Sequence, residues 1–340
     1  MNVEDFWYVV ALSRELSSGQ VLARKLFGEW LAVFRDGDGA ARVLQDRCRH
    51  RHARLSDGAV EKGCLRCPYH GWLYDGEGTV VEVPSEGEGF VKAASRKTPS
   101  FPVLERDGFV YTTFAADPEA IPPPFTIPGR GEPGFRSMVL INDFENNVTN
   151  CAENFIDIPH TVYVHPGIFR TTRRQKLDAT VRREAGEVHC EYRGEDTNLG
   201  WFARFLNPDG GGIQHTDSFF MPNVTSVEYI FGPRRRLRIT SHTVPEEAER
   251  SRVYTDLTWD FGVWSGIARP ILWWQAQKVI DQDVEALARQ MAVIRKYGRD
   301  FNNTKADAIH VLVESIIAEL EAGRDPRELP VKSVDFTFYV

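Results

Sequence analysis

Short apolar runs separated by turn residues dominate the first part of the chain and predict a β-rich domain. Trp30 to Arg35 is such a run, Asp36-Gly37-Asp38-Gly39 supplies a turn, and Ala41 to Gln45 supplies the returning strand. Three further runs with glycine punctuation follow, at Gly71 to Tyr74, Thr79 to Val83 and Gly108 to Phe114.

A stretch rich in proline and glycine then interrupts this pattern. Six prolines lie from Pro118 to Pro133, together with Gly129 and Gly131. Because proline fixes φ and supplies no backbone N–H, the stretch can form neither a helix nor a central strand. We therefore expect a first domain over residues 1–117, a linker over residues 118–135 and a second domain over residues 136–340.

The second part of the chain mixes helical and strand patterns, so the predicted fold class is α+β. Asn150 to His165 predicts a broken helical segment, and residues 180–260 alternate in strand fashion, as in Arg236 to Thr240. The final part is predicted to be helical and to contain two helices. The first carries one apolar stripe, formed by Ile280, Val284, Leu287, Met291 and Ile294, and the second covers Ala306 to Leu320.

Composition excludes several classes of protein. The 340 residues carry a formal net charge of −7, which argues against nucleic acid or an anionic membrane as a partner, since both need a positive field. No apolar run approaches the ~20 residues of a membrane span, and Met1 to Asp5 lack the features of a secretory signal. The five cysteines are an odd number, which disfavours a disulfide framework. A cytoplasmic location is expected.

Two loops of matching content form the first candidate metal site. Cys48-Arg49-His50 is followed, after sixteen residues, by Cys67-Pro68-Tyr69-His70. Zinc knuckles usually pair two cysteines or two histidines in one turn, because both bind a single ion. Here each loop carries one cysteine and one histidine, which suits two irons, one held by two thiolates and the other by two imidazoles. The alternative is a pair of buried cysteines with unrelated surface histidines.

The same loops resemble the signature of the Rieske oxygenases, which hydroxylate rings or remove methyl groups. The resemblance rests on Cys48-x-His50 and on Cys67-Pro68-Tyr69-His70-Gly71-Trp72, and it implies that Cys48, His50, Cys67 and His70 hold a [2Fe–2S] cluster. Trp7-Tyr8-Val9-Val10-Ala11 and Leu55-Ser56-Asp57-Gly58 are similar to the vanillate and dicamba O-demethylase branch. Arg49 and His52 stand where that family usually has proline and glycine, so the surface here should be more basic.

A second candidate site lies in the segment from Asn150 to His165. Two neutral imidazoles and one carboxylate on a single face leave iron(II) with open positions for O₂ and substrate. His160 and His165 are five residues apart, which on a regular helix would point them in different directions. Pro159 and the β-branched pair Thr161-Val162 predict a break that lets both rings converge.

The third ligand should be an acidic residue on another element. Asp283 falls at the edge of the apolar stripe in the first C-terminal helix, whereas Asp281 and Glu285 fall on its polar side. A carboxylate beside an apolar stripe is costly unless it is paired or binds metal. Asp283 is therefore the predicted ligand, and the alternative is an exposed acid at a helix edge.

Asp157 is predicted to support this second site. It precedes His160 by three residues, so on a helix the two share a face and the carboxylate can orient the imidazole. The family pattern, Asp-x₂-His-x₄-His with a distant Asp, implies the same set of residues. The family pattern also implies that Asp157 bridges the mononuclear site to the Rieske histidine of a neighbouring subunit. This electron route between subunits implies a homotrimer. The resemblance further implies a C-terminal helix-grip domain, an antiparallel sheet wrapped against helices.

The predicted function is that of the oxygenase component of a multicomponent Rieske monooxygenase. The cluster would deliver electrons to mononuclear Fe(II), and O₂ would hydroxylate or oxidatively demethylate a small aromatic or cyclic organic substrate. The chain has no dinucleotide-binding G-x-G-x-x-G and no plant-type ferredoxin cysteine run, so NAD(P)H must act through a separate reductase, with or without a ferredoxin. Four arginines near the cluster loops are either a solvated surface or a docking patch for an acidic electron donor: Arg49, Arg51, Arg54 and Arg66.

Two alternatives stay open at this point. Within the same enzyme class, the reaction could be ring dihydroxylation or oxidation of a steroid. In another class, the chain could be a non-enzymatic electron carrier, which would need neither a second iron nor His160 and His165. The aromatic residues of the thinly matching region indicate either an apolar pocket or plain core: Trp201, Phe202, Phe205, Phe219 and Phe220.

Overall fold

The computed structural model describes residues 1–168, 175–195, 207, 212–232 and 235–340. Internal contacts divide the chain into two compact units. The N-terminal unit comprises residues 4–124 and 244–248, and the C-terminal unit comprises residues 1–3, 125–243 and 249–340. The predicted linker, residues 118–135, spans the change from one unit to the other.

The N-terminal unit is built from small antiparallel sheets, as its short apolar runs predict. The predicted hairpin is present as β3 (Glu29–Arg35) and β4 (Ala41–Gln45). The three sheets among the described residues have the orders β1-β11-β10, β2-β3-β4-β9 and β5-β6-β7-β8. Their other strands are β1 (Tyr8–Leu12), β2 (Val21–Leu26), β5 (Ala59–Glu61), β6 (Cys64–Arg66), β7 (Leu73–Tyr74), β8 (Val80–Glu82), β9 (Ser100–Phe101), β10 (Val103–Arg106) and β11 (Phe109–Thr112).

The two cysteine–histidine loops lie beside one apolar core of this unit. The first loop follows β4, and the second connects β6 to β7. Cys48, Cys67 and Tyr74 are buried in the same cluster as Leu55 and Leu65. Because interiors are close-packed, this core gives the two loops a rigid support.

The C-terminal unit is organised around one large sheet of eight described strands. Their order is β12-β18-β17-β16-β15-β14-β13-β19, and neighbouring strands run antiparallel where the register is described. The bounds are β12 (Arg136–Phe144), β13 (Lys176–Glu184), β14 (Glu187–Arg193), β15 (Ile213–Phe220), β16 (Val224–Phe231), β17 (Arg235–Glu247), β18 (Arg250–Asp260) and β19 (Lys332–Tyr339).

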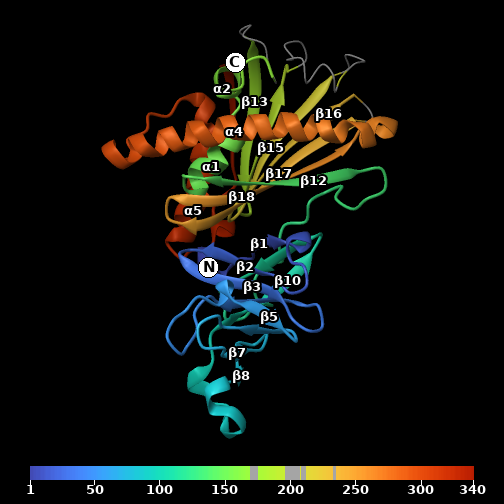
Figure 1. Ribbon diagram of the computed structural model, residues 1–340. Coiled ribbons are helices and arrows are strands. Elements are labelled where there is room, and N and C mark those ends of the chain that lie inside the picture. Colours follow the sequence, from blue (N-terminus) through green and yellow to red (C-terminus); the bar gives the residue numbers. More distant parts are fainter. Residues whose placement is uncertain (169–174, 196–206, 208–211, 233–234) are drawn as a thin grey trace. The chain divides into compact units, whose positions relative to one another are not determined.

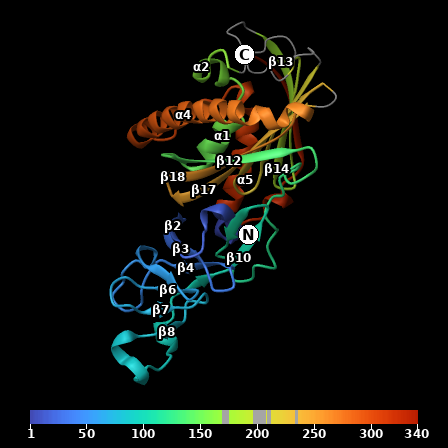
Figure 2. The same ribbon diagram turned by 45° about the vertical axis from the view of Figure 1, so that its right-hand side comes forward.

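Helices pack against this sheet, which confirms the predicted helix-grip arrangement. The long helix α4 crosses one face of the sheet (Figure 1), and the view turned by 45° shows the same crossing (Figure 2). Leu272, Ile280 and Leu287 of α4 share a core with Leu140 of β12 and Leu257 of β18. The described α-helices are α1 (Val148–Phe155), α2 (Thr161–Val164), α4 (Ser265–Tyr297) and α5 (Ala308–Glu321). No helix of the described residues is long and apolar enough to span a membrane.

Two predicted features of the C-terminal part need correction. The last strand, β19, pairs with β13 at the edge of the large sheet, although a helical end was predicted. Helix α4 begins at Ser265, well before the predicted stripe, and its first half buries Ala268 and Leu272 at helical spacing although Trp273 and Trp274 are exposed. The predicted break in the segment from Asn150 to His165 is confirmed, since α1 ends at Phe155 and α2 begins at Thr161.

Candidate functional site

The two cysteine–histidine loops have the same backbone fold. In each loop the cysteine carbonyl accepts a bond from the N–H four residues on, from His52 to Cys48 at 2.9 Å and from Gly71 to Cys67 at 3.1 Å. The cysteine N–H groups donate to the carbonyls five residues on, both at 2.8 Å. The residue four positions after the cysteine has a positive φ in both loops, 57° at His52 and 71° at Gly71. His52 thus occupies the position that glycine holds in the second loop.

The loops bring both sulfurs together and both imidazoles together. The ring centroids of His50 and His70 lie 4.5 Å apart, and His50 stacks on Trp72. Cys67, the Tyr74 hydroxyl and the backbone N–H groups of the first loop lower the pKa of the Cys48 thiol to about 5, against its burial. Tyr74 Oη lies 3.2 Å from Cys48 Sγ. The site therefore favours a thiolate at Cys48.

These four side chains fit a cluster better than a single ion. The buried Nδ1 atom of His50 has no hydrogen-bond partner among the described residues, which leaves it available to a metal. A single tetrahedral zinc would bring all four ligand atoms close together. Yet among the described residues only His160, His165 and Asp283 form a group of three or more such atoms within 4.8 Å of one another. A binuclear cluster, with two thiolates at one iron and two imidazoles at the other, fits this spacing.

Two of the four arginines beside the cluster loops form ion pairs, and the other two are exposed. Arg54 lies 3.3 Å from Asp46 and stacks over the Trp30 ring, and Arg66 is paired with Glu61 at 2.6 Å. Arg49 and Arg51 are exposed. The predicted basic surface is therefore reduced mainly to the first loop. Beside it, His70 is exposed at the tip of the second loop.

At the second site, Asp157 organises the turn between α1 and α2. Its Oδ2 atom accepts the backbone N–H of His160 at 2.9 Å and lies 3.1 Å from the Nδ1 atom of the same residue. A carboxylate only accepts, so Nδ1 carries the proton and Nε2 remains free to bind a metal. This Nε2 atom faces Asp283 Oδ1 at 3.6 Å. One acidic side chain thus holds the turn that precedes α2 and orients the ring of His160.

His165 is oriented in the same way from a different element. Its Nδ1–H donates to Oε1 of Gln282 on α4 at 2.8 Å, and its Nε2 lies 3.1 Å from Asp283 Oδ1. The Oδ1 atom of Asp283 is buried and has no hydrogen-bond donor among the described residues. Because Nε2 and Oδ1 are both acceptors in this tautomer, their approach favours a cation between them.

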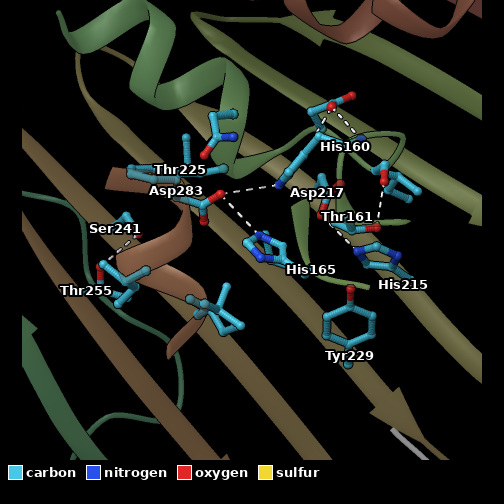
Figure 3. A pocket seen from close by; sticks show the side chains of 18 residues that line it. His160, Thr161, His165, His215, Asp217, Thr225, Tyr229, Ser241, Thr255 and Asp283 are labelled. Carbon is cyan, nitrogen blue, oxygen red and sulfur yellow. Dashed lines mark hydrogen bonds and ion pairs between the residues drawn. The ribbon is translucent and has the colours of Figure 1, made fainter. Parts of the chain in front are cut away.

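The donor set is suited to a ferrous ion. Two imidazole nitrogens and one carboxylate oxygen, from His160, His165 and Asp283, lie within 4.8 Å of one another (Figure 3). Three protein ligands on one side leave coordination positions open, as in oxygen-activating iron sites. Asp283 is only 6% exposed, whereas Asp281 and Glu285 are exposed, which agrees with the predicted choice among the three acids.

A pocket of about 110 Å³ adjoins these three residues. Its floor is one face of the large sheet, because alternate residues of neighbouring strands line it. They are His215 and Asp217 of β15, Thr225, Val227 and Tyr229 of β16, Ile239 and Ser241 of β17, and Thr255 of β18. Phe155, Ile158, Val279 and Ile280 add apolar lining from the helical side.

The sequence indicated the converging residues and Asp157, which orients His160, but not the other residues that hold or surround them. Gln282, Tyr74 and the pair His215 and Asp217 were not singled out. Of the predicted aromatic set, Phe219 is buried in the core, Phe220 packs on Phe125, and Trp201, Phe202 and Phe205 lie outside the described residues. Of the other acids near the site, Glu153 is held close to Glu314, and burial and that neighbour raise its pKa to about 8.

Two known families match the chain. The Rieske [2Fe-2S] domain matches residues 6–102, and the vanillate O-demethylase oxygenase C-terminal domain matches residues 144–323. The chain is 31% identical to the dicamba O-demethylase oxygenase component of Stenotrophomonas maltophilia, over 94% of this chain and 98% of the relative. It is 36% identical to a 4beta-methylsterol monooxygenase of Methylococcus capsulatus, over 52% and 49% of the two chains.

Solved structures give the same result. Dicamba monooxygenase bound to dicamba superimposes with a TM-score of 0.81 at 28% identity, over 94% of this chain and 98% of that chain. A second structure of that enzyme, with non-heme iron and dicamba, has a TM-score of 0.74 at 26% identity, over 94% and 97%. Sequence, fold and paired metal-binding geometry agree, and the chain belongs to the Rieske non-heme iron oxygenases, in the branch with a vanillate O-demethylase type of C-terminal domain.

Proposed function

We propose that His160, His165 and Asp283 bind the mononuclear iron of this oxygenase, and that Cys48, His50, Cys67 and His70 bind its Rieske cluster. The observation that carries the first assignment is the convergence of Nε2 of both histidines on Asp283 Oδ1, at 3.6 and 3.1 Å. The matching backbone of the two loops and the orphaned Nδ1 of His50 support the second.

The bound iron supplies the activation of O₂, and the chain's own residues prepare the site for it. Gln282 and Asp157 hold the Nδ1 protons of the two histidines, so that both Nε2 atoms are presented unprotonated. The apolar wall of Phe155, Val227 and Ile239 excludes water from the substrate. Asp157 is in addition proposed to link His160 to the Rieske histidine of a neighbouring subunit in a homotrimer, as the family resemblance implies.

The proposed reaction is hydroxylation or oxidative demethylation of a small cyclic substrate. The pocket volume of about 110 Å³ supports a small substrate, since it is of the same order as a cavity of about 150 Å³ that takes benzene. The relative named for dicamba O-demethylation supports removal of a methyl group. A one-ring substrate fits the described pocket better than a steroid does.

Electrons are proposed to come from NAD(P)H through a separate reductase, with or without a ferredoxin. Arg49 and Arg51, exposed on the first cluster loop, support an acidic docking partner, because complementary charge speeds encounter. A cytoplasmic location is proposed as well, and it is supported by five cysteines that form no disulfide.

Oxygen uptake tests the proposed function. The purified protein, supplied with a heterologous ferredoxin, its reductase and NADH, should consume O₂ when a one-ring methoxy or N-methyl compound is added. Formaldehyde should appear in step with oxygen uptake if a methyl group is removed. Electron transfer to the cluster without any substrate-dependent uptake across such a panel would instead favour an electron carrier.

A further inference from the structure

A row of hydroxyl side chains crosses the pocket floor beside the proposed iron ligands. Thr225 of β16, Ser241 of β17 and Thr255 of β18 all line the pocket, and Thr225 pairs with Ser241 in the strand register. Figure 3 shows the three residues on the side of the pocket where Asp283 lies. Ser241 Oγ lies 3.4 Å from Thr255 Oγ1, whereas O–H···O bonds are usually about 2.5–3.0 Å long. This contact is weak and leaves both hydroxyls able to bind a ligand.

Asn154 supplies an amide from the helical side of the same pocket. It lies near the end of α1, next to Phe155, which also lines the pocket. Its Oδ1 atom is buried and has no hydrogen-bond partner among the described residues. Burying an acceptor without a partner is costly, and native structures rarely do so unless a ligand or water completes the bond. A molecule bound in the pocket can complete it here.

The charged side chains that line the pocket are engaged with one another. The three proposed iron ligands face each other at 3.6 and 3.1 Å, Asp157 Oδ2 lies 3.1 Å from His160 Nδ1, and Asp217 Oδ1 lies 2.9 Å from His215 Nε2. No lysine or arginine is found among the described residues of the lining. The amide and the hydroxyl row that remain for a substrate are neutral, and neutral groups do not offset the burial of a substrate charge as a counter-ion does.

A hydroxyl group is a small neutral group that both donates and accepts hydrogen bonds. It can donate to Asn154 Oδ1 and accept from the hydroxyl of Ser241 or Thr255. Resting on the proposed function, we propose that Asn154, Ser241 and Thr255 form a neutral subsite that binds the hydroxyl group of a small, uncharged ring substrate. The ring itself would lie against Val227 and Ile239.

Binding of three matched rings to the iron-loaded holoenzyme, measured by calorimetry without oxygen at neutral pH, tests the proposal. The ligand meta-methoxyphenol carries the hydroxyl, anisole lacks it, and meta-methoxybenzoate carries a charge in its place. The phenol should bind about tenfold more tightly than anisole, which is the effect of one or two hydrogen bonds, and the benzoate should bind more weakly than the phenol. Equal affinities for the phenol and anisole, or tighter binding of the benzoate, would overturn the proposal.

Variants assign the preference to the subsite. Asn154→Leu and Thr255→Val should each reduce the affinity for the phenol about fivefold and leave the affinity for anisole unchanged. Thr240→Val is the matched control and should change neither affinity. Thr240 Oγ1 also lies 3.4 Å from a serine hydroxyl, that of Ser226, but on the opposite face of the sheet. If Asn154→Leu does not fold, Thr255→Val carries the test alone, and an unchanged phenol-to-anisole ratio in the folded variants contradicts the proposal.

These titrations separate the subsite from the proposed function, because they require no turnover. Phenol-selective binding without oxygen uptake would support the subsite and count against the oxygenase assignment. Oxygen uptake with meta-methoxybenzoate but not with meta-methoxyphenol would keep the oxygenase assignment and overturn the subsite.

Discussion

The Nδ1–H of His165 donates to Oε1 of Gln282 at 2.8 Å, one residue before Asp283 on the same helix. Helix α4 thus supplies both the carboxylate and the hydrogen bond that fixes the ring facing it. Consecutive residues of a helix point in different directions, so this is possible only because His165 lies in the angle between the two side chains.

Removing that hydrogen bond should weaken metal binding without removing a ligand. We expect Gln282→Leu to lower the affinity for the mononuclear iron by about 10- to 100-fold, because the ring loses its fixed tautomer and orientation. Iron retention during stepwise chelation measures this affinity. Gln277→Leu, which alters an amide on the same helix bonded only to Asp281 in the described contacts, is the matched control and should retain iron as the parent does.

The Tyr74 hydroxyl should tune the cluster rather than hold it. Its oxygen lies 3.2 Å from Cys48 Sγ, and hydrogen bonds to ligand sulfur stabilise the reduced, more negative cluster. Tyr74→Phe should therefore lower the reduction potential by about 50 mV, the equivalent of one modest hydrogen bond. Voltammetry or a redox titration followed by absorbance measures the shift. A potential equal to that of the parent would show that this contact has no influence on the cluster.

The matching loops offer a paired test of backbone conformation. Gly71 has φ of 71°, and a Cβ there would approach Pro84 Cγ to 3.1 Å. Gly71→Ala should cost about 1–2 kcal/mol and lower the temperature at which the visible cluster spectrum is lost by about 2–4 °C or more. His52→Ala at the equivalent position should have a smaller effect, since that loop already accepts a side chain at φ of 57°. Equal losses in the two variants would contradict the explanation by backbone strain, because His52→Ala adds no Cβ at this position.

The residues that the structure brings together were predictable from the sequence because their chemistry is local. Cys48-x-His50 and Cys67-x₂-His70 carry all four proposed cluster ligands in two short segments, and His160 and His165 follow a proline that breaks the helix. Asp283 was predictable because a carboxylate next to an apolar stripe needs a partner. The family match confirms the predicted fold class, enzyme class and cofactors.

Residues that act across elements were not predictable in the same way. Gln282 has no distinctive pattern on a polar helix, and its role depends on how α2 packs against α4. His215 and Asp217 alternate on β15 and so share a face, but only the assembled sheet shows that this face is the pocket floor. The strand β19 had a usable signal, since Val334, Phe336 and Phe338 alternate with polar residues. Its pairing with β13 joins parts of the chain that lie far apart in sequence.

The count of iron in Asp283→Asn tests the central assignment most directly. The parent protein should contain about three iron atoms per chain, two in the cluster and one alone. Asp283→Asn should lose the lone iron and all substrate-dependent oxygen uptake, while the visible spectrum of the cluster and the thermal stability of the N-terminal unit stay unchanged. Asp281→Asn, two residues away on the exposed side of α4, should keep all the iron. Full iron occupancy in Asp283→Asn would contradict the account.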